Sequence, residues 1–125
     1  MKLLLDTHVL LWAAVDSPRI KSIRSRLLAP DNEVYFSVAS LWEIATKVSL
    51  GKLQADAAAI RSAALDNGFA ELPIRGPHAL HVGALPWLHR DPFDRLLIAQ
   101  AASEPMWLLT ADDTLLAYGG TVELI

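Results

Sequence analysis

Short apolar runs alternate with segments of helical periodicity along the whole chain of 125 residues. The runs have the length and residue types of strands, and the segments between them carry apolar residues spaced as in helices. This alternation predicts an α/β domain with a largely parallel sheet. A single domain over residues 1–125 is expected, because this length suits one core. The expected strands are residues 2–5, 34–37, 69–74, 107–110 and 121–125.

Capping and turn residues divide the intervening segments into helices. Thr7 is expected to cap the first helix, and Gly51 and Gly68 are expected to end two later ones. Asp91 is expected to cap the last long helix, because Pro92 then occupies the first helical position. The expected helices cover residues 8–13, 20–28, 55–67, 77–85, 92–102 and 113–118, with one more through Trp42 and Val48.

The chain contains no cysteine. This excludes disulfide scaffolds, thiolate zinc sites and cysteine nucleophiles. A metal must therefore be held by oxygen or imidazole, and an oxygen-rich site favours hard cations such as Mg²⁺ or Mn²⁺.

No apolar run approaches the roughly 20 residues that a bilayer-spanning helix requires. The N-terminal residues 1–5 are similar to the start of a secretory signal, but Asp6 and His8 interrupt the apolar segment early. A strand is the better interpretation of this segment. We expect a cytoplasmic protein without a membrane partner.

Four acidic residues stand where strands end or helices begin. Asp6 closes the first strand and Asp112 follows the fourth, while Glu43 and Asp94 lie early in helices. Because the carboxyl ends of parallel strands share one edge of a sheet, where ligands bind, these side chains are expected to converge.

Converging carboxylates repel one another, and divalent cations relieve that repulsion. Two such ions roughly 4 Å apart can activate a water molecule and stabilise the leaving oxygen of an in-line phosphoryl displacement. Setting the four acids aside leaves ten acidic against eleven basic residues, a net charge of +1 for the rest of the chain. Such a surface is compatible with RNA.

Glu43 also has structural interpretations. Ser40 and Glu43 match a capping box, in which the glutamate only satisfies a backbone N–H. Glu43 can also pair with Lys47 one turn later. If Ser37 is the true cap, the capping box fails and a functional role gains weight.

The other acids have structural alternatives of the same kind. Asp94 can favour the positive end of its helix, and Asp112 or Asp113 can cap the helix that follows them. We assign Asp112 to the site and Asp113 to the surface, although neighbouring acids can exchange roles. His8 lies beside Asp6 and can contact the site or substrate, but a hydrogen-bonded structural role is favoured. His89 is expected in an exposed loop where RNA contact is possible.

The segments that carry these acids resemble the signature of PIN-domain proteins and, more narrowly, of VapC-type toxins from bacterial toxin–antitoxin pairs. The matching segments occur in order along nearly the whole chain, at residues 3–8, 37–45, 50–53, 91–101 and 109–112.

This resemblance implies a Rossmann-like three-layer α/β/α sandwich. It also implies an Mg²⁺- or Mn²⁺-dependent endoribonuclease, usually a homodimer, with a cognate antitoxin. By this match Asp6 and Asp94 are the foremost metal ligands, and Glu43 and Asp112 complete the acidic set directly or through water. Thr110 matches the polar residue that commonly precedes the last acid.

The expected reaction is hydrolysis of RNA phosphodiesters by metal-activated water, which leaves a 5′-phosphate. One alternative is a catalytically silent PIN-like module that binds RNA or a protein. Another is a metal-dependent phosphatase. The phosphatase is less favoured because the segment from Asp6 to His8 lacks a second aspartate two residues after the first.

Overall fold

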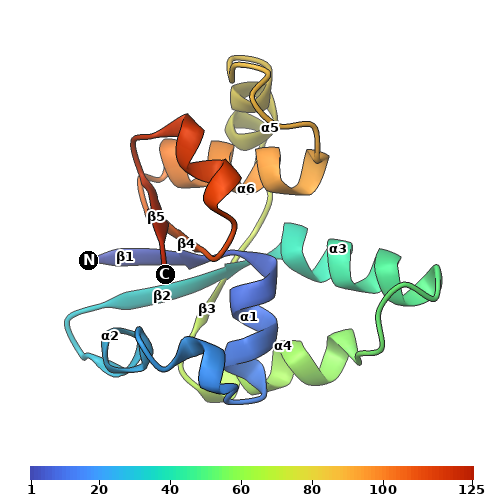
Figure 1. Ribbon diagram of the computed structural model, residues 1–125, viewed down its shortest axis with the longest axis vertical. Helices are drawn as coiled ribbons and strands as arrows, with labels where there is room; N and C mark the ends of the chain where they lie inside the picture. Colours follow the sequence, from blue (N-terminus) through green and yellow to red (C-terminus); the bar gives the residue numbers. More distant parts are fainter.

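The computed structural model describes residues 1–125 and has a five-stranded, all-parallel sheet in the order β3-β2-β1-β4-β5. All five strands expected from the sequence are confirmed, and the third and fifth are shorter than expected. Figure 1 shows β1 near the middle of the sheet. The strands are β1 (Lys2–Leu5), β2 (Glu33–Ser37), β3 (Ala70–Leu72), β4 (Trp107–Thr110) and β5 (Val122–Leu124).

The central strand β1 determines the position of the site. Leu4 pairs with Tyr35 of β2 on one side and with Leu108 of β4 on the other. Leu3, Leu4 and Leu5 are all fully buried, as expected for a parallel strand covered on both faces. Because β1 and β4 are direct neighbours, the residues that follow them emerge side by side.

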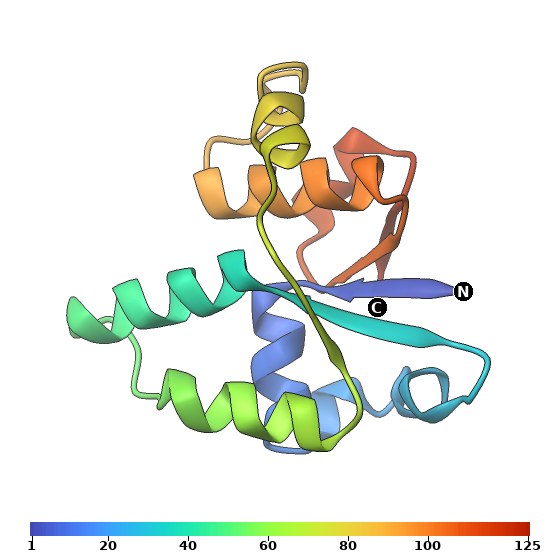
Figure 2. The ribbon, with the colours of Figure 1, turned by 180° about the vertical axis from the view of Figure 1, so that it is seen from behind.

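Helices cover both faces of the sheet, which confirms the three-layer α/β/α architecture. Leu3 and Leu5 pack with residues of α1, α2 and α4, whereas Leu4 packs with residues of α6 and η2 on the opposite face. Figures 1 and 2 show these two layers on either side of β1. The helices are α1 (Thr7–Ala14), η1 (Pro18–Ile20), α2 (Arg24–Leu28), α3 (Val38–Ser49), α4 (Ala57–Asp66), α5 (Gly76–Val82), α6 (Pro92–Ser103) and η2 (Asp113–Tyr118). No helix is both long and apolar enough to cross a membrane.

Two local expectations are wrong. The continuous helix over residues 20–28 is divided into the 3₁₀ turn η1 and the short helix α2. The backbone N–H of Lys21 donates to the Pro18 carbonyl and that of Ile23 donates to the Ile20 carbonyl, each at 3.0 Å, and these i→i+3 bonds are those of a 3₁₀ turn. The N-cap of α1 is Asp6, not Thr7, because the chain is still extended at Asp6 when β1 ends.

Helix α3 lies between the two cores. Its first turn contributes Ala39 to the core beside Leu4, and Ile44 packs in the core beside Leu3 and Leu5. Figure 2 shows α3 leaving the end of β2 and extending beyond the sheet. The helix thereby carries Glu43 to the edge where β1 and β4 end.

Truncation of β1 tests this central role. Leu4→Ala is expected to lower the free energy of unfolding by about 2–5 kcal/mol, because it removes a fully buried side chain between two strands. Leu80→Ala is the matched control, since Leu80 is 81% exposed, and its effect is expected to stay within about 0.5 kcal/mol. Urea denaturation measures both, and equal stabilities would contradict the central placement of β1.

Candidate active site

The four acids singled out from the sequence line one cavity of about 610 Å³ at the carboxyl edge of the sheet. Asp6 directly follows β1, Asp112 follows β4 by two residues, Glu43 lies in α3, and Asp94 lies in the first turn of α6. The expected convergence is therefore present in the structure. The cavity is also lined by His8, Lys47, Leu88, His89, Arg90 and Asp91.

Asp6 is the most enclosed of the four acids after Glu43, with 4% of its surface exposed. Its Oδ1 accepts a hydrogen bond from the Thr7 N–H at 2.7 Å, and its Oδ2 accepts one from the Thr110 hydroxyl at 2.6 Å. Burial raises the pKa of the Asp6 carboxyl, and these two hydrogen bonds oppose that rise only in part.

Thr110 joins the ends of the two central strands. Its hydroxyl donates to Asp6 and accepts a hydrogen bond from the Asp112 N–H at 3.0 Å. The Asp6 N–H donates in turn to the Leu109 carbonyl at 3.0 Å. These contacts fix the spacing between Asp6 and the backbone of Asp112.

Glu43 is only 3% exposed, and both of its carboxylate oxygens accept hydrogen bonds. The Thr7 hydroxyl donates to Oε1 at 2.7 Å, and Lys47 Nζ donates to Oε2 at 2.6 Å. This hydrogen bond to the Glu43 carboxylate raises the pKa of Lys47. The expected pairing with Lys47 is thus confirmed, while the capping box is wrong, because Ser37 is the N-cap of α3.

Asp94 lies at the N-terminus of α6, where Asp91 is the N-cap, as expected, and accepts from the Asp94 N–H at 3.0 Å. Asp94 Oδ2 is 2.8 Å from His89 Nε2. Burial, followed by the nearby charges of Asp91 and Asp6, raises the pKa of Asp94 to about 6. This carboxyl therefore gains or loses its proton close to neutral pH.

Asp112 has a different environment, because it also caps η2. Its Oδ1 accepts from the Thr114 N–H at 3.0 Å and from the Thr114 hydroxyl at 2.6 Å. The hydroxyl bond is the main reason that the pKa of Asp112 is lowered. Asp113 is exposed and does not line the cavity, as expected for a surface residue.

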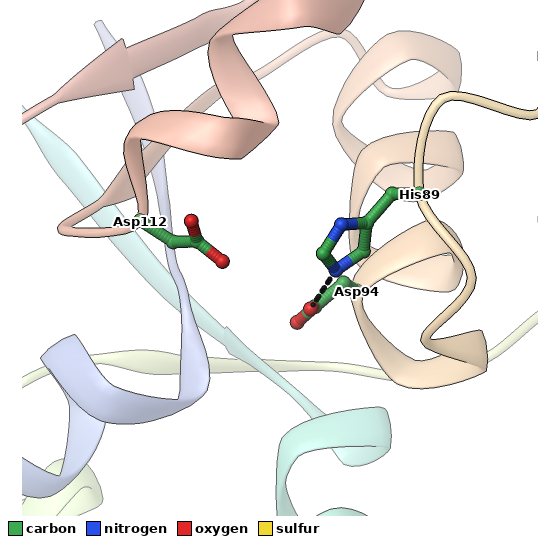
Figure 3. A group of neighbouring side chains, drawn as sticks. All are labelled: His89, Asp94 and Asp112. Atoms are coloured by element: carbon green, nitrogen blue, oxygen red, sulfur yellow. Dashed lines mark hydrogen bonds and ion pairs between the residues drawn. The ribbon is translucent and has the colours of Figure 1, made fainter.

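Three of the cavity residues bring ligand-type atoms close enough to share one ion. His89, Asp94 and Asp112 each offer one such atom, and these atoms lie within 4.8 Å of one another. Figure 3 shows the three side chains converging from the loop before α6, from α6 itself and from the segment after β4. Oxygen and imidazole together form a donor set that fits a divalent cation.

His89 was not among the site residues expected from the sequence. Its one signal was its position two residues before the N-cap Asp91, at the same helix terminus as Asp94. His8 fits the less favoured of its two interpretations, because it is exposed and lines the cavity beside the acids.

Comparison with known proteins identifies the family. The model of the PIN domain family matches residues 3–120. The chain belongs to the PIN domain family. This confirms the family expected from the sequence motifs, and no curated protein sequence matches the chain.

Solved structures share the fold of this PIN domain. A chain of VapBC2 from Rickettsia felis, bound to a DNA fragment from the promoter, aligns with a TM-score of 0.74 and 18% identity over 99% of this chain and 98% of the other. A chain of DNA-bound VapBC from Salmonella typhimurium aligns with a TM-score of 0.70 and 17% identity over 100% and 97%. A chain of VapBC-5 from Mycobacterium tuberculosis, a member of the VapBC family of toxin-antitoxin systems, aligns with a TM-score of 0.59 and 25% identity over 99% and 97%.

Removal of the Thr110 hydroxyl tests how the PIN domain positions Asp6. Thr110→Val keeps the shape of the side chain but leaves a buried carboxylate oxygen without its donor, which is expected to cost about 1–3 kcal/mol of stability. Thr110→Ser retains the hydroxyl and is expected to restore most of that loss. Chemical denaturation at neutral pH measures the difference, and a valine variant as stable as the serine variant would refute the positioning role.

The raised pKa of Asp94 predicts a pH-dependent instability of the metal-free protein. A carboxyl with a raised pKa in the folded state favours folding while protonated, and this contribution is lost as the pH rises from about 4 through 6. Asp94→Asn is therefore expected to be more stable than the wild type. Its advantage should grow by roughly 2 kcal/mol between pH 4 and pH 7.5, at 1.36 kcal/mol for each tenfold change in the ionisation constant.

Thermal unfolding in a chelating buffer measures this advantage at each pH. The control is Asp113→Asn, which changes an exposed neighbour of the site and is expected to follow the wild-type curve. Addition of Mg²⁺ at pH 7.5 should stabilise the wild type more than Asp94→Asn. An advantage of Asp94→Asn that is constant with pH would show that burial does not perturb this carboxyl.

Proposed function

We propose that this PIN domain is a divalent-metal-dependent endoribonuclease, with Asp6, Glu43, Asp94 and Asp112 as its acidic site. The observation that carries the proposal is the meeting of these four side chains in one cavity. Asp6 and Glu43 are both buried at this cavity, and hydrogen bonds from Thr7, Thr110 and Lys47 hold their carboxylates in place. Mg²⁺ or Mn²⁺, when bound, supplies positive charge that offsets the carboxylates and the phosphate and favours ionisation of water.

The residues of the cavity have separable roles in this proposal. Asp94 and Asp112 would hold the cation, because each brings a carboxylate oxygen into the group of ligand-type atoms that lie within 4.8 Å of one another. Asp6, fixed by Thr7 and Thr110, adds negative charge that attracts the cation.

Positive side chains at the cavity rim suit a polyanionic substrate. Arg90 is exposed and Lys47 is half-buried, and both line the same cavity as the acids. They attract the phosphates that flank the scissile bond. The cavity is open and almost entirely polar in its lining residues, which suits a strand of RNA better than a small apolar ligand.

We further propose that the protein is the toxin of a toxin–antitoxin pair and that it forms a homodimer. The support is the similarity in fold to chains of VapBC complexes from three bacteria. An apolar groove of about 560 Å³ between α1 and the segment leading into α4 suits an antitoxin segment. Its largest apolar lining residues are Leu11, Trp12, Leu53 and Ile60.

Cleavage of RNA by the purified protein tests the enzymatic proposal. Mg²⁺ or Mn²⁺ is expected to support cleavage of a structured RNA, and a chelator is expected to abolish it. Asp6→Asn and Asp112→Asn are each expected to reduce the rate by roughly 10²- to 10⁴-fold, while Asp113→Asn keeps wild-type activity. The melting temperature of Asp6→Asn should not fall, because the substitution removes a buried charge whose pKa is raised.

Two further measurements separate the competing functions. RNA with methylated 2′-hydroxyls is still expected to be cut, with 5′-phosphate products, because water and not the 2′-oxygen attacks phosphorus. A generic phosphate monoester is expected to remain intact. Binding of RNA without cleavage would favour the silent module, and turnover of the monoester alone would favour a phosphatase.

A further inference from the structure

His89 stands apart from the other cavity residues because it is a nitrogen donor among carboxylates. Its ring and the carboxylates of Asp94 and Asp112 each direct one ligand-type atom into a space in which no two of these atoms are more than 4.8 Å apart (Figure 3). The His89 and Asp94 side chains are 22% and 18% exposed, so solvent and small ions reach them.

One pair of these atoms has a spacing close to that of adjacent ligands of a divalent ion, and the 4.8 Å limit on the others is about 0.6 Å longer than the distance between opposite ligands. With metal–ligand distances of about 2.1 Å, adjacent ligands of an octahedral ion lie about 3 Å apart and opposite ligands about 4.2 Å apart. His89 Nε2 and Asp94 Oδ2 are 2.8 Å apart, which is close to the adjacent spacing. A cation shared by these two atoms would replace the hydrogen bond between them.

The hydrogen bonds within the cavity leave Asp94 and Asp112 each with one carboxylate oxygen that has no hydrogen-bond donor. Both oxygens of Asp6 and both oxygens of Glu43 accept hydrogen bonds from the chain. Asp94 uses Oδ2 for His89, and Asp112 uses Oδ1 for Thr114, so each has one oxygen without a hydrogen-bond donor. Asp94 and Asp112 thus retain capacity to bind a cation beside His89.

A buried arginine holds His89 in this position. Arg95 is 3% exposed, and its guanidinium donates to the carbonyls of Pro86 at 3.0 Å and Val82 at 3.1 Å and to the Tyr118 hydroxyl at 3.0 Å. The ring of Trp87 covers the guanidinium, with 3.9 Å between its centroid and Arg95 Cζ. Asp91 fixes the other end of the loop as the N-cap of α6. The loop that carries His89 is therefore held from both sides.

We propose that His89 is a direct ligand of the metal, together with Asp94 and Asp112, and that it makes the site prefer Mn²⁺ to Mg²⁺. Imidazole nitrogen binds transition-metal dications more readily than it binds Mg²⁺, whose preferred ligands are oxygens. This inference rests on the proposed function only in placing the metal at the same site, and it adds a ligand and a metal preference to it.

Pulsed electron paramagnetic resonance of the Mn²⁺-loaded full chain, without RNA, tests the inference directly. A coordinated imidazole produces ¹⁴N modulation of the Mn²⁺ echo, whereas carboxylates and water do not. The wild type is expected to show this modulation, and protein labelled only with [¹⁵N]histidine is expected to show the ¹⁵N pattern instead. The label identifies a histidine ligand without any substitution.

Substitutions then identify which of the four histidines is bound. His89→Gln is expected to lose the modulation, while His8→Gln, at the other histidine of the cavity, and His81→Gln, outside it, are expected to keep it. Calorimetry should show a Mn²⁺ affinity at least about tenfold weaker in His89→Gln, since even loss of a residue that supports a ligand costs about 10- to 100-fold. Mg²⁺ affinity should change much less.

The outcomes separate this inference from the proposed function. Mn²⁺ that binds without nitrogen modulation, or with modulation that persists in His89→Gln, overturns the role of His89 and leaves a metal-dependent nuclease with an all-oxygen site. Absence of any Mn²⁺ binding overturns both. If His89→Gln does not fold, the labelled wild type and His8→Gln still decide the matter, because loss of modulation in His8→Gln assigns the nitrogen to His8.

Discussion

The hydrogen bond from the Thr110 hydroxyl to Asp6 is the contact on which the organisation of the site depends. It joins two residues that are 104 positions apart in sequence, at 2.6 Å. The same hydroxyl accepts from the Asp112 N–H, so one side chain sets the positions of two acids. This arrangement requires β1 and β4 to be neighbouring parallel strands that end at the same level, as their register shows.

The four acids expected from the sequence form two pairs with different electrostatic surroundings. Asp6 and Glu43 are buried, and donors from the chain occupy all of their oxygens, including Lys47 on Glu43. Asp94 and Asp112 are more accessible, and each retains an oxygen without a donor. In the proposed function, the second pair is therefore the better placed to bind a cation. The two pairs differ because the chain donates hydrogen bonds to both oxygens of each buried acid but to only one oxygen of Asp94 and of Asp112.

Much of the fold could be predicted because the informative signals are local. The strands follow from short apolar runs, and the N-cap role of Asp91 follows from Pro92 beside it. The convergence of the four acids follows from one rule about parallel sheets, since each acid lies at a strand end or early in a helix. Choosing between Ser37 and Ser40 as the cap of α3 required the end of β2, which local sequence defines only to within a few residues.

The role of His89 could not be predicted because it depends on contacts between distant segments. Its loop has no periodicity, and its conformation is set by Arg95 from α6 together with Tyr118 from η2. A sequence shows that a histidine precedes Asp91, but not that a buried guanidinium turns its loop towards the acids. The division of residues 20–28 was not predicted either, because the buried Ile20 and Ile23 lie three positions apart, a spacing that a 3₁₀ turn and an α-helix share.

The central place of β1 in the sheet has a consequence for how the protein is made. Strand β1 has its β4 partner more than 100 residues later in the chain, since Leu3 pairs with Trp107. Until that partner is synthesised, β1 lacks one of its two neighbours, and Asp6 lacks both Thr110 and Asp112. The acidic cavity therefore cannot assemble on the nascent chain before β4 and Asp112 have been synthesised, and any activity of this cavity begins only after that point.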